Sequence, residues 1–418
     1  MAPAESHAHF QLQRQASREH VDVPLLVRRE RLLRIQKMLD EHGPVLASAV
    51  QADFGMRSPL LTEVADFFVL RSLLSHTLRH LGRWMKPKKV STPLVLQPAS
   101  AWIARQPLGV VGVISPWNYP VQLALAPAIT ALAAGNRVML KPSELTPHTS
   151  AQLAALVAQF FSPDEFCVVQ GDANLAALFA SLPFDHLVFT GSTAVGRKVA
   201  QAAAQNLTPT TLELGGKSPC IIDGHCDMKD AALKIAHGKL LNAGQTCIAP
   251  DYVLLPPALQ AAFIEKARAW VAQHYPNLAA NRDYSHIINP TQLARLQGYL
   301  QQAAADGAEI VPLAADAANP SSGNSTLLPP HIVYNAPAHS PLMQEEIFGP
   351  LLPLVPYQQL NEALEYIRAR PLPLALYVFG KTQAQIDHVL HNTVSGGVSV
   401  NDTLFHVAQE NLPFGGVG

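Results

Sequence analysis

The sequence has little charge and few cysteines. Charged residues make up 15% of the 418 residues and the formal net charge is -1, against a charged fraction of roughly 25% in typical soluble domains. Lysines and arginines form no cluster, which excludes an electrostatic surface for nucleic acid or for an anionic membrane. The four cysteines have no regular spacing, which excludes a disulfide framework and favours a reducing compartment, the cytoplasm.

Long apolar runs and metal-ligand spacings are also lacking. The N-terminus carries charges and glutamines where a signal peptide needs an apolar run. The longest membrane-span candidate, residues 121–134, is interrupted by Gln122, Pro127 and Thr130. The 17 histidines show no HxxxH spacing that lies near carboxylates, and Cys220 and Cys226 have no CxxC partner. We therefore expect a soluble protein without a metal site.

Apolar residues, at 48%, are plentiful enough for a large core, and the length suggests two or three domains. Leucines and valines recur every three or four residues over 24–53 and 59–84, which predicts amphipathic helices. Prolines punctuate residues 87–107. Within that stretch, VSTPLVLQ and SAWIARQ predict the two strands of a hairpin or a protruding arm.

From Leu108 the pattern changes to short β-branched runs that alternate with alanine-rich helical stretches. This alternation predicts right-handed crossovers and a parallel sheet, whose ligands bind at the carboxyl ends of the strands. A second alternating region follows PTTLELGGK, with helices predicted over 228–242, 258–274 and 290–306 and a loop over 313–326. The predicted fold class is α/β.

Cys247 is a candidate nucleophile because it follows a predicted helix in the polar turn NAGQTC. Backbone amides or a nearby base in such a turn can lower the pKa of a thiol and expose the reactive thiolate. The competing interpretation is a small buried apolar residue. The polar, glycine-containing turn favours the first interpretation.

Glu213 is a candidate base in the stretch TLELGGK. Flanking leucines can partly desolvate this carboxyl group and raise its pKa toward the range of a general base. The two glycines that follow permit close approach of another chain segment. The competing interpretation is an ordinary surface residue of a strand.

Two nucleotide-binding motifs fail. Gly216-Lys217-Ser218 could end a phosphate-binding P-loop, but Thr211 stands where that motif needs glycine, and no GxGxxG occurs. The segment from Gly191 to Gly196 instead marks a strand-to-helix junction, where free backbone amides favour an anion. Ser192 could equally be the N-cap of that helix.

Three further polar residues stand at predicted strand ends. Asn118, ahead of a helix, could donate to a developing oxyanion, or could be a turn residue beside proline. Lys141 and Glu144 could bind ribose hydroxyls or phosphate, or could be solvated charges.

Together these motifs resemble the aldehyde dehydrogenase superfamily, in particular its bacterial coniferyl-aldehyde dehydrogenase branch. The resemblance rests on QPLGVVGVISPWNYP, LKPSELTPHTS, PFDHLVFTGSTAVG, TLELGGKSP, NAGQTCIAPDYVLLP, EEIFGPLLPL and LPFGGVG, which run from about Gln106 to Gly418. The 34 positions from Glu213 to Cys247 also match the family.

The resemblance implies a Rossmann-like cofactor domain and an α/β catalytic domain with a small oligomerisation arm. The implied boundaries are N-terminal helices over 1–86, the arm over 87–107, the NAD(P)-binding domain over 108–212, the catalytic domain over 213–400, and the start of a C-terminal segment over 401–418. In the family this segment continues past PFGGVG into a tail that contributes to oligomerisation. We therefore expect that a homodimer, and activity, depend on that tail.

The resemblance also implies the roles of the site residues. Cys247 would be the nucleophile, Glu213 the general base, and Asn118 with the Cys247 amide the oxyanion hole. The residues implied in cofactor binding are Ile114, Ser115, Trp117, Lys141, Ser143, Glu144, Gly171, Gly191, Ser192, Gly196, Leu214, Glu346 and Phe348. A carboxylate at Glu144 would accept from a ribose 2′-hydroxyl and repel a 2′-phosphate, which favours NAD over NADP.

The implied reaction is oxidation of an aldehyde to an acid through a cysteine thiohemiacetal and thioester. Tyr119 and Phe405 would suit an aromatic substrate such as coniferyl aldehyde, while medium-chain aliphatic aldehydes stay open. Two further alternatives are a cofactor-independent esterase that uses Cys247 and a non-catalytic homologue.

Overall fold

The computed structural model describes residues 3–314 and 325–417. The chain divides into two compact units, each with its own sheet. The first unit contains Met1–Asp53 and Thr62–Leu212, and the second contains Phe54–Leu61 and Glu213–Gly418. The α/β class expected from the sequence is confirmed.

The N-terminal segment is helical, as predicted. Its elements are α1 (Pro3–Glu19), α2 (Leu25–Phe54), α3 (Pro59–Thr62), the π-helical turn η1 (Glu63–Phe68) and α4 (Val69–Trp84). The π-turn was not predicted. It contains Asp66, a fully buried carboxylate that accepts hydrogen bonds from the backbone N–H groups of Val121 and Gln122 at 3.2 and 2.9 Å. Those N–H groups start the next helix of the first unit, whose own N-cap residue provides no side-chain acceptor.

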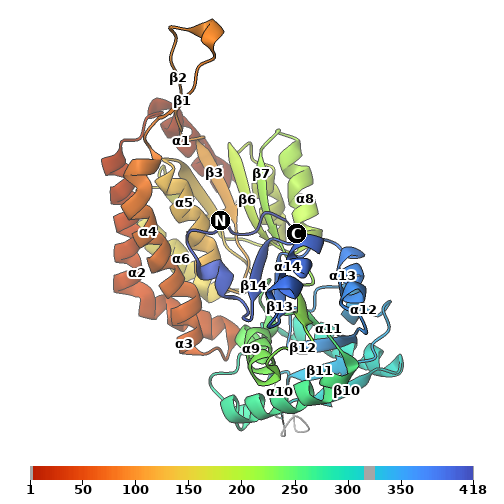
Figure 1. Cartoon of the computed structure of the whole chain (residues 1–418). Helices are drawn as coiled ribbons and strands as arrows, with labels where there is room; N and C mark the ends of the chain where they lie inside the picture. Colours follow the sequence, from red (N-terminus) through yellow and green to blue (C-terminus); the bar gives the residue numbers. More distant parts are fainter. Residues whose placement is uncertain (1–2, 315–324, 418) are drawn as a thin grey trace. The chain divides into compact units, whose positions relative to one another are not determined.

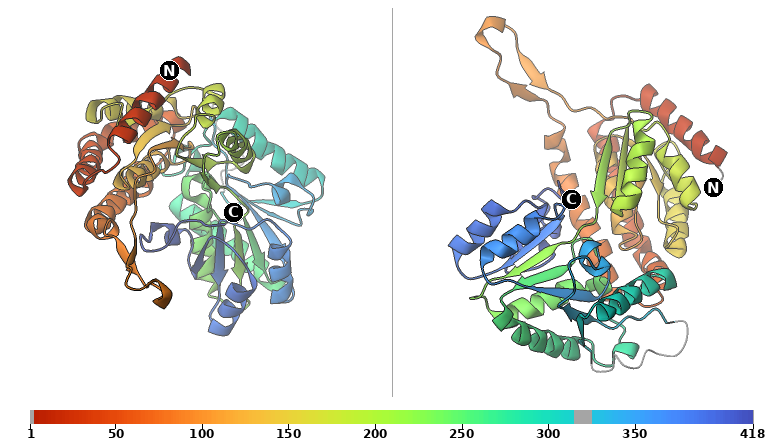
Figure 2. Two further views of the ribbon diagram at one scale, coloured as in Figure 1. Left: turned by 90° about the horizontal axis from the view of Figure 1, so that it is seen from above. Right: turned by 90° about the vertical axis from the view of Figure 1, so that its right-hand side faces the viewer.

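A short antiparallel hairpin projects from the first unit, in orange in Figures 1 and 2. It pairs β1 (Lys88–Val90) with β2 (Ala101–Ile103). The prediction that VSTPLVLQ is a strand is wrong beyond Val90, because Leu94–Leu96 form a 3-10 turn, η2. Pro93 has no N–H for a strand ladder, and its φ of -52° suits the start of a turn.

The sheet of the first unit has the strand order β5-β4-β3-β6-β7. Its strands are β3 (Val110–Ile114), β4 (Arg137–Lys141), β5 (Phe166–Val168), β6 (His186–Gly191) and β7 (Thr210–Leu214). The pairs β3–β4, β3–β6 and β4–β5 are parallel. The chain therefore winds outward from β3 in one direction and from β6 in the other, which makes the gap between these strands the topological switch point.

Four helices connect these strands: α5 (Gln122–Ala133), α6 (Pro147–Phe160), α7 (Ala173–Ala180) and α8 (Thr193–Ala204). Right-handed crossovers place α5 and α6 on one face of the sheet and α7 and α8 on the other. The sheet is thus covered on both faces, which accounts for the continuous burial of β3 and β4.

The sheet of the second unit has the order β10-β11-β12-β9-β8-β13-β14, and its neighbouring strands are parallel except for β10 and β11. Its strands are β8 (Pro219–Ile222), β9 (Tyr252–Leu255), β10 (Glu309–Pro312), β11 (His331–Tyr334), β12 (Leu351–Pro356), β13 (Ala375–Phe379) and β14 (Gly397–Val400).

Three helices of this unit match the sequence prediction: α9 (Met228–Leu240), α10 (Gln260–His274) and α11 (Pro290–Ala305). Two more follow, α13 (Leu360–Arg368) and α14 (Gln383–Asn392). Shorter pieces are α12 (Pro341–Gln344), η3 (Leu241–Gly244), η4 (Pro257–Leu259), η5 (Leu278–Ala280) and η6 (Phe405–Ala408). Most of the predicted loop over 313–326 lies outside the described residues.

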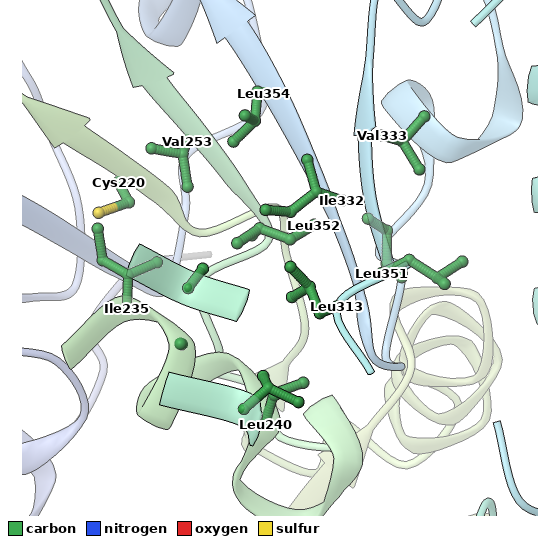
Figure 3. Packing of buried hydrophobic residues seen from close by; sticks show 14 of the residues in the cluster. Cys220, Ile235, Leu240, Val253, Leu313, Ile332, Val333, Leu351, Leu352 and Leu354 are labelled. Atoms are coloured by element: carbon green, nitrogen blue, oxygen red, sulfur yellow. The ribbon is translucent and has the colours of Figure 1, made fainter. Parts of the chain in front are cut away.

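Alternating strand residues divide the core of the second unit between the two faces of its sheet. Cys220 and Ile222 of β8 pack in one cluster with Ile235 and Leu240 of α9 (Figure 3). Ile221, between them in sequence, packs in a second cluster with α13 and α14. This two-residue period is the expected consequence of a strand pleat buried on both sides.

Phe54–Leu61 joins the second unit although the helices around it belong to the first. Ser58 donates to the Asp283 carboxylate at 2.9 Å, and the His286 backbone N–H donates to the Met56 carbonyl oxygen at 2.9 Å. An N-terminal segment of eight residues is therefore built into a structure formed by the C-terminal half.

Candidate active site

Cys247 lies in a rigid turn after α9. The helix ends at Leu240 because Asn242, Ala243 and Gly244 all have positive φ angles, of 51°, 52° and 76°. A side chain at Gly244 would collide with the Gly349 carbonyl group, so this position needs glycine.

Gln245 fixes the same turn from inside. Its fully buried amide donates to the carbonyl oxygens of Asn242 and His286, each at 3.0 Å, and accepts from the Ile288 N–H at 3.0 Å. The turn thus presents Cys247, which is only partly buried, from an immobile backbone.

Burial raises the pKa of the Cys247 thiol to about 12, and the charges of Glu346 and then Glu213 act in the same direction. The backbone N–H groups of Cys247 and Ile248 oppose this rise. The expectation that the turn lowers the pKa of this thiol is therefore wrong in sign. Burial and the two carboxylates outweigh the amides, and the thiol holds its proton at neutral pH until a base takes it.

Glu213, in β7, has its pKa raised to about 7 by burial, which confirms the direction predicted from its leucine neighbours. Its carboxylate is close enough to act on the thiol of Cys247. A side chain at Gly415, in the motif PFGGVG, would come within 2.9 Å of the carboxylate oxygen of Glu213. The motif therefore lies against this carboxylate.

A small cavity of about 20 Å³ lies between the turn that carries Cys247 and this motif. It is lined by Ile248, Leu374, Gly397, His406, Val407 and residues 412–415. Its lining is mainly apolar, and it borders both the residue after the thiol and the glycine against Glu213.

Glu346 approaches the double glycine after Glu213. A side chain at Gly215 would collide with its carboxylate, and the N–H of Gly216 donates to it. Burial and the charge of Asp251 raise the pKa of Glu346 to about 8. Its Oε1 is buried and has no hydrogen-bond partner among the described residues. The group that approaches the two glycines closely is thus the carboxylate of Glu346.

Three charged residues beside Glu346 were missed as a group by the sequence analysis. Lys217 donates to Asp251 at 2.6 Å, and the Nζ of Lys239 lies 3.7 Å from the other carboxylate oxygen of Asp251. All three side chains are at most 9% exposed. Lys217 was considered only as part of a P-loop. The sequence signal that could have identified Lys239 is its position between Gly238 and Leu240 in an otherwise apolar part of a helix.

Most of the remaining predicted residues lie in the first unit, at the carboxyl ends of its strands. Ile114 and Ser115 end β3, Trp117 and Asn118 follow in the next turn, and Lys141 ends β4. Ser143 and Glu144 come directly after, Gly171 follows β5, and Gly191, Ser192 and Gly196 lie at the junction of β6 and α8. Because β3 pairs with both β4 and β6, three of these groups share one sheet edge at the switch point. Leu214, Glu346 and Phe348 lie in the second unit.

Lys141 is buried, so the interpretation as a solvated charge is wrong for it. It donates to the exposed carboxylate of Glu144 at 2.6 Å. Asn118 is also buried, at 2% exposure. Ser192 caps α8 through the N–H of Val195, which confirms the capping interpretation and leaves the first-turn amides at the sheet edge.

The described ranges contain no group of three or more histidine, cysteine or acidic side chains that could hold a metal ion. His76 and His80 are four residues apart on α4, but His80 Nδ1 contacts the His76 carbonyl oxygen and no third ligand completes a site. Within the same ranges, no helix is long and apolar enough to cross a membrane.

The family model described as "Aldehyde dehydrogenase family" matches residues 2–418. A protein of Pseudomonas aeruginosa named "Probable coniferyl aldehyde dehydrogenase" is 50% identical over 92% of this chain and 79% of its own length. The "Aldehyde dehydrogenase, dimeric NADP-preferring" of Rattus norvegicus is 40% identical over 94% of this chain and 85% of its own. A solved Staphylococcus aureus structure, titled as the substrate-bound state of AldH, superposes with a TM-score of 0.92 at 35% identity, over 99% of this chain and 88% of that one.

Proposed function

This chain belongs to the aldehyde dehydrogenase family, whose members use NAD or NADP, and we propose that it oxidises an aromatic aldehyde such as coniferyl aldehyde to the carboxylic acid. The observation that carries the proposal is the pair of Cys247, on a rigid turn, and Glu213, a carboxyl group with a pKa of about 7 whose charge acts on that thiol. The coniferyl name of a 50% identical relative supports the aromatic class.

The residues present fit a nicotinamide dinucleotide. The unpartnered, buried Oε1 of Glu346 is an acceptor available to a ribose hydroxyl. By the family motif, Glu346 and Phe348 would bind the nicotinamide riboside. Lys141, Glu144 and the other residues at the strand ends of the first unit would bind the rest of the cofactor. Bound NAD or NADP would supply the hydride acceptor.

We assign NAD as the preferred cofactor because of Glu144. Its exposed carboxylate can accept from a 2′-hydroxyl, and it would repel a 2′-phosphate. The comparison with the NADP-preferring rat relative makes this a point to measure directly. The ratio of kcat/KM for the two cofactors is the test.

In the proposed reaction, Cys247 attacks the aldehyde carbon after its proton passes to a carboxylate, and Asn118 with the Cys247 N–H receives the oxyanion. Once the hydride has left, the substrate is a thioester on Cys247. Glu213 then takes a proton from water, and the resulting hydroxide displaces the thiolate and releases the acid. A carboxyl group with a pKa of about 7 suits this last step, because it is half ionised at neutral pH.

The test is aldehyde-dependent reduction of NAD by the wild type and by Cys247→Ala, with coniferyl aldehyde, benzaldehyde and hexanal as substrates. We expect turnover with the wild type, fastest with coniferyl aldehyde, and none with the variant. NAD binding by the variant is the control for a folded protein. Turnover that persists in Cys247→Ala would refute the mechanism, and a preference for hexanal would refute the substrate class.

A further inference from the structure

The segment that carries Glu346 and Phe348 is held by side chains bonded to its backbone. Lys217 Nζ donates to the carbonyl oxygens of Leu342 and Glu345, both at 2.9 Å. Asp251 Oδ1 accepts from the Ile347 N–H at 3.2 Å, while its Oδ2 pairs with Lys217. One buried ion pair therefore fixes the segment on both sides of Glu346.

A second set holds the segment from α11. Arg295 Nη2 donates to the Ile347 carbonyl oxygen at 2.8 Å, and Nη1 of the same guanidinium donates to the Tyr299 hydroxyl at 3.0 Å. The Tyr299 hydroxyl donates in turn to the Glu345 carboxylate at 2.6 Å. The N–H and the C=O of Ile347 are thus both bonded to charged side chains from different parts of the second unit.

These hydrogen bonds hold the backbone next to Phe348, which has a φ of 50°. A bulky residue in the left-handed region is strained and keeps that conformation only if its surroundings impose it. The Ile347 carbonyl belongs to the peptide plane that precedes Phe348. A bond from Arg295 to that oxygen therefore orients the plane about which the Phe348 φ angle is defined.

We propose that Arg295, with Asp251, is a positioning residue that imposes the strained backbone at Phe348 and so presents Glu346 and Phe348 to the nicotinamide riboside. The inference rests on the proposed function, since it takes the cofactor role of these two residues from the family motif. Neither Arg295 nor Asp251 reacts. Each acts through the backbone of Ile347.

The experiment compares NAD affinity with cofactor-independent hydrolysis of p-nitrophenyl acetate, which needs the thiol of Cys247 but not the cofactor. In Arg295→Met, which keeps the aliphatic stem, we expect the Kd for NAD from calorimetry to rise about tenfold, as for loss of one charge-assisted hydrogen bond. Ester hydrolysis should stay within about twofold, because the turn of Cys247 has its own bonds. Arg295→Lys, which keeps a charged donor, should recover part of the affinity.

The matched control is Arg268→Met. Arg268 also donates to a backbone carbonyl of the second unit, that of Pro312 at 3.0 Å, but at the β10 edge. This variant should bind NAD like the wild type. Tyr299→Phe, which removes one hydroxyl and leaves the ring, is the second variant should Arg295→Met fail to fold, and a smaller rise in Kd is expected for it.

Unchanged NAD affinity in folded Arg295→Met, or in Tyr299→Phe if only that variant folds, overturns the inference. So does a parallel loss of NAD binding and ester hydrolysis, which would show a general structural role. A wild type that does not bind NAD at all would instead refute the proposed function, and the inference with it. The wild-type titration therefore separates the two failures.

Discussion

At the scale of single residues, two carboxyl groups with similar pKa values act on one thiol. Glu213 has a pKa of about 7 and Glu346 a pKa of about 8, both raised by burial. They differ in their neighbours: Glu346 adjoins the buried charges of Lys217, Lys239 and Asp251, whereas no charged residue contributes to the shift of Glu213. We therefore assign the transfer of the proton to Glu213, whose pKa no charged neighbour shifts.

The pH profile of turnover is the test of that assignment. Because the ionised form of Glu213 is the base and its pKa is about 7, kcat should rise with pH through about 7 and level off above it. Glu213→Gln should lower kcat about 10²- to 10⁴-fold and abolish this rise. A variant that keeps both its rate and its pH dependence would show that another group is the base.

The two glycines after Glu213 make a matched pair of variants. In Gly215→Ala the new methyl group would collide with the Glu346 carboxylate, whereas in Gly216→Ala the nearest atoms, in Pro373 and Leu374, lie 3.7 Å away. We expect Gly215→Ala to weaken NAD binding about tenfold or more, as for a displaced binding group. Gly216→Ala should bind like the wild type. Equal affinities in a titration would show that Glu346 does not contact the cofactor.

The sequence predicted the nucleophile and base candidates but not the electrostatics of the thiol. A turn of polar residues is visible locally, so a lowered pKa was the reasonable expectation for Cys247. Burial, which only the fold decides, is the largest cause of the raised pKa, and Glu346, whose charge adds to it, stands 99 positions away. Lys239 and Asp251 were missed for the same reason, since only the fold places their charges beside Glu346.

At the scale of elements, the apolar periodicity predicted the helices of both units well. It failed at two places where a single residue decides the local structure. The π-turn at Glu63–Phe68 holds Asp66 against the first N–H groups of α5, and this requirement has no local signal. The strand predicted for the hairpin does not continue through Pro93, because the missing N–H of this residue outweighs the strand propensity of the β-branched residues around it.

Asp66 gives a prediction for the element that follows Asn118. Asp66→Ala leaves the N–H groups of Val121 and Gln122 without this acceptor, so we expect a loss of about 1–3 kcal/mol in the free energy of unfolding. Asp172→Ala removes an exposed cap from α7 and should cost about 1 kcal/mol. Denaturant unfolding of both variants is the measurement. An Asp66 variant no less stable than the Asp172 variant would contradict the capping role.

At the scale of the whole molecule, alternating strands and helices predicted the α/β class. The membership of Phe54–Leu61 in the second unit was not predictable. Residues 59–84 have the continuous periodicity of helices, and nothing in that pattern marks a change of unit. What decides it is a hydrogen bond such as Ser58 to Asp283, whose partners are 225 residues apart.

The projecting hairpin makes a prediction about association. Leu94 and Val95 are 86% and 89% exposed at its tip, and apolar side chains so exposed are typical of an interface. We expect the wild type to be a dimer and Leu94→Asp/Val95→Asp to shift toward monomer in light scattering. Leu207→Asp, at a site equally exposed at 89%, should not. A doubly substituted protein with unchanged mass would exclude the hairpin from the interface.

The placement of Phe54–Leu61 also bears on the order of events during synthesis. When Ser58 is added to the growing chain, Asp283 is still 225 residues from being made, a delay of about 10–45 s at roughly 5–20 residues per second. For that time the nascent chain carries a segment whose final neighbours do not yet exist, between helices that can already fold. The protein therefore cannot complete its folding in order from the N-terminus. The contacts of Phe54–Leu61 form only after residues of the C-terminal half have been synthesised.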